Sequence, residues 1–176
     1  MDHSDKGLML FEGRPLVCHM IERIKPHVEP LLINCNRNAE TYAQLGYPLL
    51  EDAVPDFSGP LRGLHSAGPH LVTDYCFVVP CDMPHLPVDV LPCLLRNIGQ
   101  HAAAYALAAG RAQPLVLLVK CAMARQVSQY LDQGGRSVMG WLEQIAAVGV
   151  EIKSPPGAFD NINTLEQLLP TGPEQD

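Results

Sequence analysis

The sequence predicts an α/β protein in which helices cover both faces of a mostly parallel sheet. Three observations lead to this fold class: short apolar runs of strand length, stretches with helical spacing between them, and connections of only a few residues. A chain of 176 residues forms one domain with a sizeable core and is too short for two. We expect the domain to span residues 1–170 and a disordered tail to follow at 171–176.

The expected elements follow from local patterns. Five apolar runs have the character of strands, namely 31–35, 77–79, 102–107, 115–119 and 150–153. Apolar residues fall on one face at helical spacing in 15–24, 122–132 and 137–147. A last short helix is expected from Thr164 to Leu169, with Thr164 as its N-cap.

Composition excludes several classes of function. The chain has 12 basic and 19 acidic side chains, a net charge of −7, and no basic cluster, so no nucleic-acid partner is expected. It contains no apolar stretch of membrane-spanning length and no export segment, so no membrane association is expected. The six cysteines lack zinc-finger spacing, and several lie in apolar runs. We interpret them as reduced core residues of a cytoplasmic protein, with a disulfide or zinc site as the alternative.

The start of the chain departs from this architecture. A doubly wound domain usually opens with a strand whose following turn handles phosphate. This chain instead opens with the polar residues 1–7, a short apolar run at 8–11 and a helix. The sequence therefore predicts a sheet whose first strand is missing.

The strongest chemical signal is the segment Phe77-Val-Val-Pro-Cys-Asp-Met-Pro84. An apolar strand ends there in Asp82, and ligands of open α/β sheets gather at the carboxyl ends of strands. A lone carboxylate at that place suits Mg²⁺, which completes its shell with water and substrate phosphates. The alternative role is a turn aspartate that caps its own backbone. The residues alone leave both roles open.

Other polar residues could join such a site, each with an ordinary structural alternative. Asp52 follows a short apolar run, as Asp82 does. Asn34 lies within an apolar run, where an amide is costly unless it is hydrogen-bonded. It either hydrogen-bonds to the ribose or base of a nucleoside or only forms hydrogen bonds within a loop. Lys6 stands beside a glycine and is either a phosphate partner or a solvated surface lysine.

Two further motifs are weaker. The segment Ser58-Gly-Pro-Leu-Arg-Gly63 places glycines around an expected helix start, where exposed N–H groups can face an anion. Asn161 and Asn163 precede the expected last helix. Amides at such positions more often organise the entry of the helix than bind a ligand.

Taken in order, these segments resemble the molybdenum cofactor guanylyltransferases, the MobA family. The resemblance covers the whole chain except its tail, and it is the order and spacing of the pieces that are specific. The matching pieces are Asp5-Lys-Gly-Leu8, Gly13-Arg-Pro-Leu16, Ile33-Asn34, Asn36-Arg37, Tyr42, Glu51-Asp52, Gly59-Pro-Leu-Arg-Gly63, Pro80-Cys-Asp-Met-Pro84, Gln113-Pro114, Gly135-Arg-Ser-Val138 and Asn161-Ile-Asn-Thr-Leu-Glu166.

Two departures separate this chain from the related cytidylyltransferase. That enzyme tends to carry aspartates where this chain has Asn161 and Asn163. It also tends to carry a glycine-aspartate-glutamine pattern where this chain has Pro80-Cys-Asp82. The resemblance therefore favours guanylyl over cytidylyl transfer.

The resemblance implies a three-layer, Rossmann-like nucleotidyltransferase fold that binds GTP with Mg²⁺. It implies that GMP is transferred to the molybdopterin form of the molybdenum cofactor and that pyrophosphate is released. It assigns nucleotide contacts to Lys6, Asn34, Asp52 and Asp82, catalytic roles to Lys6 and Asp82, and the metal to Asp82. Asn161 and Asn163 match positions on the cofactor side. We expect a monomer with transient contacts to other proteins of cofactor biosynthesis.

Members of this family begin with a strand and a glycine-rich loop just before the Asp-Lys-Gly segment. Met1 falls about where that loop ends, so we expect the natural protein to begin upstream, with the start codon placed too late. We also expect the 176-residue chain alone to be poorly soluble or inactive. The alternatives are a non-catalytic fragment that binds nucleotide or cofactor and, less favoured, a cytidylyl or sugar-phosphate nucleotidyltransferase.

Overall fold

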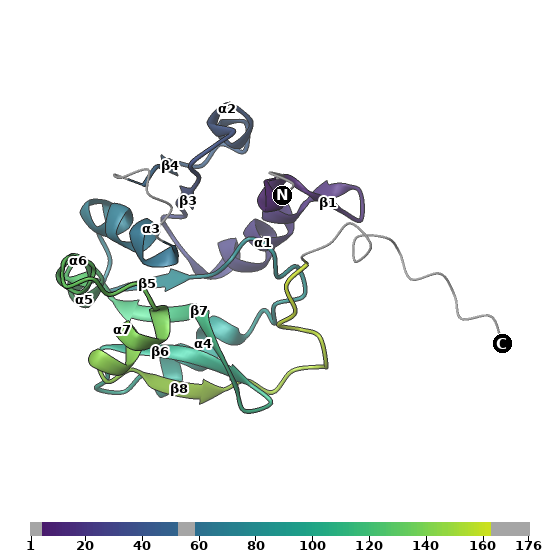
Figure 1. The fold of residues 1–176 in the computed structure, drawn as a ribbon. Helices are drawn as coiled ribbons and strands as arrows, with labels where there is room; N and C mark the ends of the chain where they lie inside the picture. The colour runs from purple at the N-terminus through teal and green to yellow at the C-terminus, as the bar shows by residue number, and fades with distance from the viewer. Residues whose placement is uncertain (1–4, 53–58, 163–176) are drawn as a thin grey trace.

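The structure, a computed structural model, describes residues 5–52 and 59–162. Its centre is a four-stranded sheet in the order β5-β7-β6-β8, visible in the lower half of Figure 1. The strands are β5 (Tyr75–Val78), β6 (Ala103–Ala108), β7 (Arg111–Lys120) and β8 (Val148–Glu151). All four coincide with predicted apolar runs, which confirms that strand length and composition identified this part of the sheet.

The long strand β7 shows the layers of the fold. Val116 and Leu118 point into a core shared with helix α4 (Val90–Asn97), whereas Leu117 and Val119 point into a second core shared with α7 (Val138–Gln144). Alternate residues of a strand face opposite sides of the sheet, so both faces are covered. Figure 1 shows α7 on the near face and α4 on the far one. The predicted three-layer α/β class is confirmed.

Strand direction differs in part from the prediction of a mostly parallel sheet, because the central sheet is mixed. β7 runs antiparallel to both β5 and β6, and β6 is parallel to β8. The cause is the tight connection between β6 and β7, in which Ala109 and Gly110 have φ of 49° and 73°. Two successive residues with positive φ form the preferred two-residue hairpin turn, and parallel strands need a much longer crossover.

The N-terminal third forms short elements beside this sheet. They are η1 (Lys6–Leu8), β1 (Leu10–Phe11), β2 (Arg14–Pro15), α1 (Leu16–Ile24), η2 (Lys25–His27), β3 (Ile33–Asn34), α2 (Ala39–Ala43), β4 (Leu49–Leu50), α3 (Pro60–Ala67) and η3 (Gly68–His70). β1 and β2 form a small hairpin, and β3 pairs with β4 in parallel. The carboxyl ends of β3 and β4 carry the candidate residues Asn34 and Asp52.

A gap separates the β3–β4 pair from the central sheet. Within the described residues, β3 pairs only with β4, and the edge strand β5 pairs only with β7. A cavity of about 900 Å³ lies between them and is lined by mainly apolar side chains from α1, β3, α3 and β5, including Ile21, Ile33, Leu64 and Phe77. The facing edges of β3 and β5 therefore pair with no further strand among the described residues.

The remaining helices refine the predicted boundaries. The expected helix at 122–132 is two short helices, α5 (Cys121–Ala124) and α6 (Val127–Asp132). α7 begins after Ser137, whose side chain accepts a hydrogen bond from the Gly140 N–H as an N-cap. The predicted helix 164–169 and the predicted tail 171–176 lie outside the described residues. Across 5–52 and 59–162 no helix is long and apolar enough to cross a membrane.

Candidate functional site

Asp82 lies just beyond the end of β5, where the sequence predicted an acid at the mouth of the sheet. It is 7% exposed and is the one polar or charged side chain that is buried among the described residues. Lys6 Nζ lies 3.4 Å from its Oδ2. The lysine side chain is 48% exposed, so the pair joins a shielded carboxylate to a cation that water reaches. A buried carboxylate is tolerated only with such partners.

Asn34 and Asp52, the other two predicted nucleotide contacts, also lie together. Asn34 Nδ2 donates a hydrogen bond of 3.1 Å to Asp52 Oδ1. Parallel pairing of β3 with β4 produces this contact, since it places the carboxyl ends of both strands side by side. Both residues therefore occupy one corner of the gap between the sheets.

Asn36 completes this corner and was not predicted as a site residue. Its Nδ2 donates to Asp52 Oδ2 at 2.7 Å, and its Oδ1 accepts from the backbone N–H of Asp52 at 2.8 Å. These reciprocal bonds fix the carboxylate of Asp52 with both oxygens engaged. The available signal was spacing: Asn34 and Asn36 stand two residues apart, which places them on one side of an extended chain.

Helix α3 approaches the same corner through Gly63. A Cβ added at Gly63 would stand 3.1 Å from both Cγ and Oδ1 of Asn34, which is tighter than ordinary contact. Gly59, at the N-cap of α3, has φ of 89°, a conformation suited to glycine. The two glycines therefore allow the helix start to lie close against Asn34; that its N–H groups face an anion stays a prediction. Ser58 lies outside the described residues.

The segment that carries Asn161 passes beside Asp82. The backbone N–H of Ile162 donates to the carbonyl oxygen of Asp82 at 2.9 Å. This bond places the half-buried Asn161 one residue from a direct backbone contact with Asp82. Asn163, its predicted companion, lies outside the described residues.

The Asn34–Asp52 pair faces the cavity, and the chain reaches the cavity wall again just before Asp82. Asn34, Asn36 and Asp52 line one wall, and Pro80 and Cys81, directly before Asp82, line the other. No contact joins Asp52 to Asp82 among the hydrogen bonds of the described residues. The cavity therefore has a polar corner at Asn34, Asn36 and Asp52 and mainly apolar walls, a form typical of small-molecule sites.

Cys81 is a thiol at this cleft and stays protonated. Burial, together with the nearby charges of Asp82 and Asp5, raises its pKa to about 11. A neutral thiol is a poor nucleophile and a poor metal ligand. Cys81 therefore contributes packing here, in agreement with the prediction that the cysteines are core residues.

A divalent cation would have Asp82 as its protein ligand. Within the described parts of the chain, no group of three histidine, cysteine or acidic side chains is close enough to enclose a metal. A shielded oxygen ligand alone at the mouth of a cleft fits Mg²⁺, which binds through one or two carboxylates and takes its other ligands from water and substrate phosphates. The residues present therefore fit this ion.

Comparison with known sequences gives the family. Residues 1–146 match the family described as MobA-like NTP transferase domain. The molybdenum cofactor guanylyltransferase of Shewanella loihica is 41% identical over 169 residues, which covers 95% of this chain and 86% of that protein. The protein of the same name from Serratia proteamaculans is 36% identical and covers 96% and 86% of the two chains.

Solved structures agree on the fold. The molybdopterin-guanine dinucleotide biosynthesis protein A of Archaeoglobus fulgidus superposes with a TM-score of 0.72 at 20% identity, covering 94% of this chain and 88% of that one. The 2-C-methyl-D-erythritol 4-phosphate cytidylyltransferase of Thermus thermophilus superposes with a TM-score of 0.68 at 15% identity, covering 93% and 90%.

The family match covers the segments that carry most of the candidate residues. The Asp-Lys-Gly turn, the acid after β5 and the paired asparagines all lie within the matched region, residues 1–146. The chain belongs to the MobA-like NTP transferase family, a family of nucleotidyltransferase enzymes.

Proposed function

We propose that this protein transfers GMP from GTP to the molybdopterin form of the molybdenum cofactor, with release of pyrophosphate. The observation that carries the proposal is the Lys6–Asp82 pair at the end of β5, in a chain whose curated relatives are named molybdenum cofactor guanylyltransferases. A shielded carboxylate beside a half-exposed ammonium is the pair of charges that a metal-bound triphosphate requires.

The proposed reaction is an in-line displacement at the α-phosphorus of GTP. The terminal phosphate oxygen of molybdopterin forms a bond to that phosphorus, and the bond to the oxygen bridging the α- and β-phosphates breaks. The electron pair of the broken bond leaves with pyrophosphate. A phosphate monoester is already an anion at neutral pH, so the reaction needs no strong general base. Positioning and charge neutralisation then supply the catalysis.

Lys6 and Asp82 have separate roles in this scheme. The half-exposed Lys6 ammonium donates to phosphate oxygens and holds the triphosphate in line. The Asp82 carboxylate would hold Mg²⁺, which when bound would supply charge neutralisation for the triphosphate. The shielding of Asp82 keeps its position fixed before the substrate arrives.

The opposite corner would hold the nucleoside. Asp52 has both carboxylate oxygens engaged by Asn34 and Asn36, so it is held rigidly and offers its remaining lone pairs to a ribose or a base. Asn34 itself keeps its amide oxygen directed toward α3 and the cleft. Asn161, beside Asp82, and Asn163 would face the molybdopterin side.

Whether the gap between β3 and β5 is filled by a further strand should decide whether the protein is active. An extended segment of apolar residues placed there could pair with both facing strand edges and fill the cavity of about 900 Å³. A chain without such a strand would bind nucleotide weakly and not turn it over, which is the second candidate function. Both candidates can be tested with the chain itself and with a form extended at its amino terminus by an apolar strand and a glycine-rich loop.

The test is product formation from molybdopterin, Mg²⁺ and a nucleoside triphosphate, followed by chromatography of the dinucleotide. We expect GTP to give product in the extended form and CTP to give little. Product from CTP in preference to GTP would indicate a cytidylyltransferase. Transfer to a sugar phosphate in place of molybdopterin would indicate a sugar-phosphate nucleotidyltransferase. Nucleotide binding without product in both forms would support the non-catalytic alternative.

A further inference from the structure

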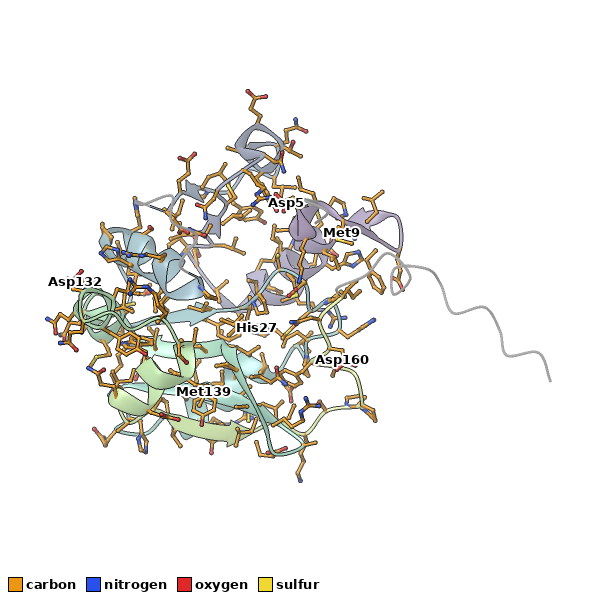
Figure 2. All side chains as sticks on the ribbon, viewed as in Figure 1. Asp5, Met9, His27, Asp132, Met139 and Asp160 are labelled. Carbon is orange, nitrogen blue, oxygen red and sulfur yellow. The ribbon has the colours of Figure 1, made fainter. Side chains whose placement is uncertain are left out.

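Asp5 lies one residue before Lys6 and is joined to three groups. Its Oδ1 accepts hydrogen bonds from the hydroxyl of Tyr42 at 2.7 Å and from the backbone N–H of Gly7 at 3.2 Å. Its Oδ2 accepts from Asn38 Nδ2 at 3.0 Å. Figure 2 shows Asp5 between the N-terminal turn and the segment that carries α2. The carboxylate thus connects two segments that are more than thirty positions apart in the sequence.

These contacts fix the turn that carries Lys6. Asp5 is the N-cap of η1, and its carbonyl oxygen accepts from the Leu8 N–H at 3.1 Å. Gly7 is buried against Tyr42, and a Cβ at this position would stand only 2.3 Å from the tyrosine hydroxyl. The turn therefore has one close-packed place beside α2, and the direction in which Lys6 leaves it is set.

The partners of Asp5 are themselves firmly held. Tyr42 is 4% exposed and packs in the core formed by Val17, Ile21 and Ile33. Burial, followed by the hydrogen bond to Asp5, raises the pKa of Tyr42 well above its ordinary value, so the phenol remains a donor at every working pH. Asn38 adopts φ of 55°, a conformation that asparagine tolerates, and it begins α2.

The segment that carries Asn38 also carries part of the corner formed by Asn34, Asn36 and Asp52, where the proposed function places the nucleoside. Asn38 follows Asn36 by two residues, and Asn36 holds Asp52 through two hydrogen bonds. The Asp5 carboxylate is therefore the link between the turn that carries Lys6 and the loop that carries Asn34 and Asn36. A nucleoside triphosphate spanning the cleft would need these two halves at a fixed separation.

We propose that Asp5 is a positioning residue that acts through Tyr42 and Asn38 to hold Lys6 in register with the Asn34–Asp52 corner. The proposal rests on the proposed function, because it assigns Lys6 to the phosphates and the corner to the nucleoside of one substrate. The hydrogen-bond partners of the Asp5 carboxylate are Gly7, Tyr42 and Asn38, so in this scheme it acts through them and not on the phosphates. Its removal should weaken triphosphate binding through Lys6 alone.

A double-mutant cycle on Mg·GTP affinity tests this proposal, measured by calorimetry in the chain and in its extended form. Asp5→Asn should weaken binding about tenfold, the size of one lost hydrogen bond to a charged group. In the Lys6→Ala background, Asp5→Asn should change the Mg·GTP affinity by less than about twofold, because the lysine through which Asp5 acts on the phosphates is absent. Asp132→Asn, at the exposed end of α6, removes the same charge and should leave affinity unchanged.

A rescue variant separates positioning from a general loss of structure. In Asp5→Asn the new NH₂ group faces the NH₂ group of Asn38 in its present orientation, so two donors meet until the Asn38 amide turns over. Adding Asn38→Asp restores a donor and an acceptor with the roles exchanged, so most of the affinity should return. The exchange rate of the Gly7 amide, read by NMR without nucleotide, should rise in Asp5→Ala because this N–H loses its acceptor.

The outcomes are distinct. Additive losses from Asp5→Asn and Lys6→Ala, or no loss from Asp5→Asn, would overturn the positioning role and leave the proposed function intact. Absence of Mg·GTP binding by the parent in both forms would contradict the proposed function, and the role of Asp5 would fall with it. A slow, unchanged Gly7 amide in Asp5→Ala would overturn the role whatever the nucleotide does.

Discussion

The ammonium of Lys6 lies 3.4 Å from the carboxylate of Asp82, although 76 positions separate the two residues in the sequence. The contact joins the turn at the beginning of the described chain to the end of the edge strand β5. Asp82 is shielded and Lys6 is half-exposed, so a bound phosphate would approach the lysine from the open side. This geometry leads to the first prediction.

Lys6→Ala should lower kcat for nucleotide transfer by about 100-fold or more, the typical loss when one group that stabilises developing charge is removed. Lys6→Arg retains the charge but replaces a point cation with a planar fork, so it should recover part of the rate. Steady-state kinetics of dinucleotide formation gives both values. A change in kcat of less than about threefold in Lys6→Ala would show that Lys6 is a solvated surface residue with no role in the reaction.

Gly63→Ala should separate binding from stability. The new methyl group would press on the side chain of Asn34 and displace it from Asp52, so the affinity for GTP should fall by several-fold. Alanine within a helix is more favourable than glycine by up to about 1 kcal/mol, so Tm should not fall. Gly68→Ala is the matched control, because its Cβ would meet Arg125 at an ordinary 3.8 Å. Equal affinities in the two variants would contradict the role of Asn34.

The thermal stability of the protein should decline in alkaline solution because of Cys76. Burial raises the pKa of this thiol from 9.0 to about 12, so the unfolded chain releases the proton before the folded one. The stabilisation is complete below pH 9 and is lost as the pH rises from 9 toward 12. Cys76→Ala should make Tm less dependent on pH in this window. The same slope in both proteins would refute the assignment.

Extension of the chain by an apolar strand and a glycine-rich loop should raise Tm. Each buried backbone group that gains a partner contributes about 1–3 kcal/mol, and several such groups on β3 and β5 would be paired. A gain of at least about 5 °C is expected for a protein of this size. An extension of the same length with polar residues at the inward positions is the control. If both extensions act alike, the gap does not take a strand.

The sequence predicted what depends on local pattern. The apolar runs gave β5, β6, β7 and β8, and the abrupt end of the run at 77–79 located Asp82. These features depend on residues close together in the chain, and for that reason they can be recognised without the structure.

Features that depend on tertiary contacts were missed or only partly predicted. The mixed direction of the sheet comes from a hairpin at Ala109 and Gly110, and alanine rarely adopts the positive φ that this turn requires. Helix α4 was missed. The role of Asn36 depends on the position of Asp52, which its spacing from Asn34 only hints at, and the role of Asp5 depends on Tyr42, which no local spacing indicates.

The most direct test of the proposed function replaces Asp82 in the form extended at its amino terminus. Asp82→Ala removes the proposed ligand of Mg²⁺, and Asp82→Asn retains the shape while removing the charge. We predict that both variants fold with near-normal Tm and that dinucleotide formation from Mg·GTP and molybdopterin falls by at least about 100-fold. Dinucleotide formation at the rate of the unmodified protein in either variant would contradict the proposed site.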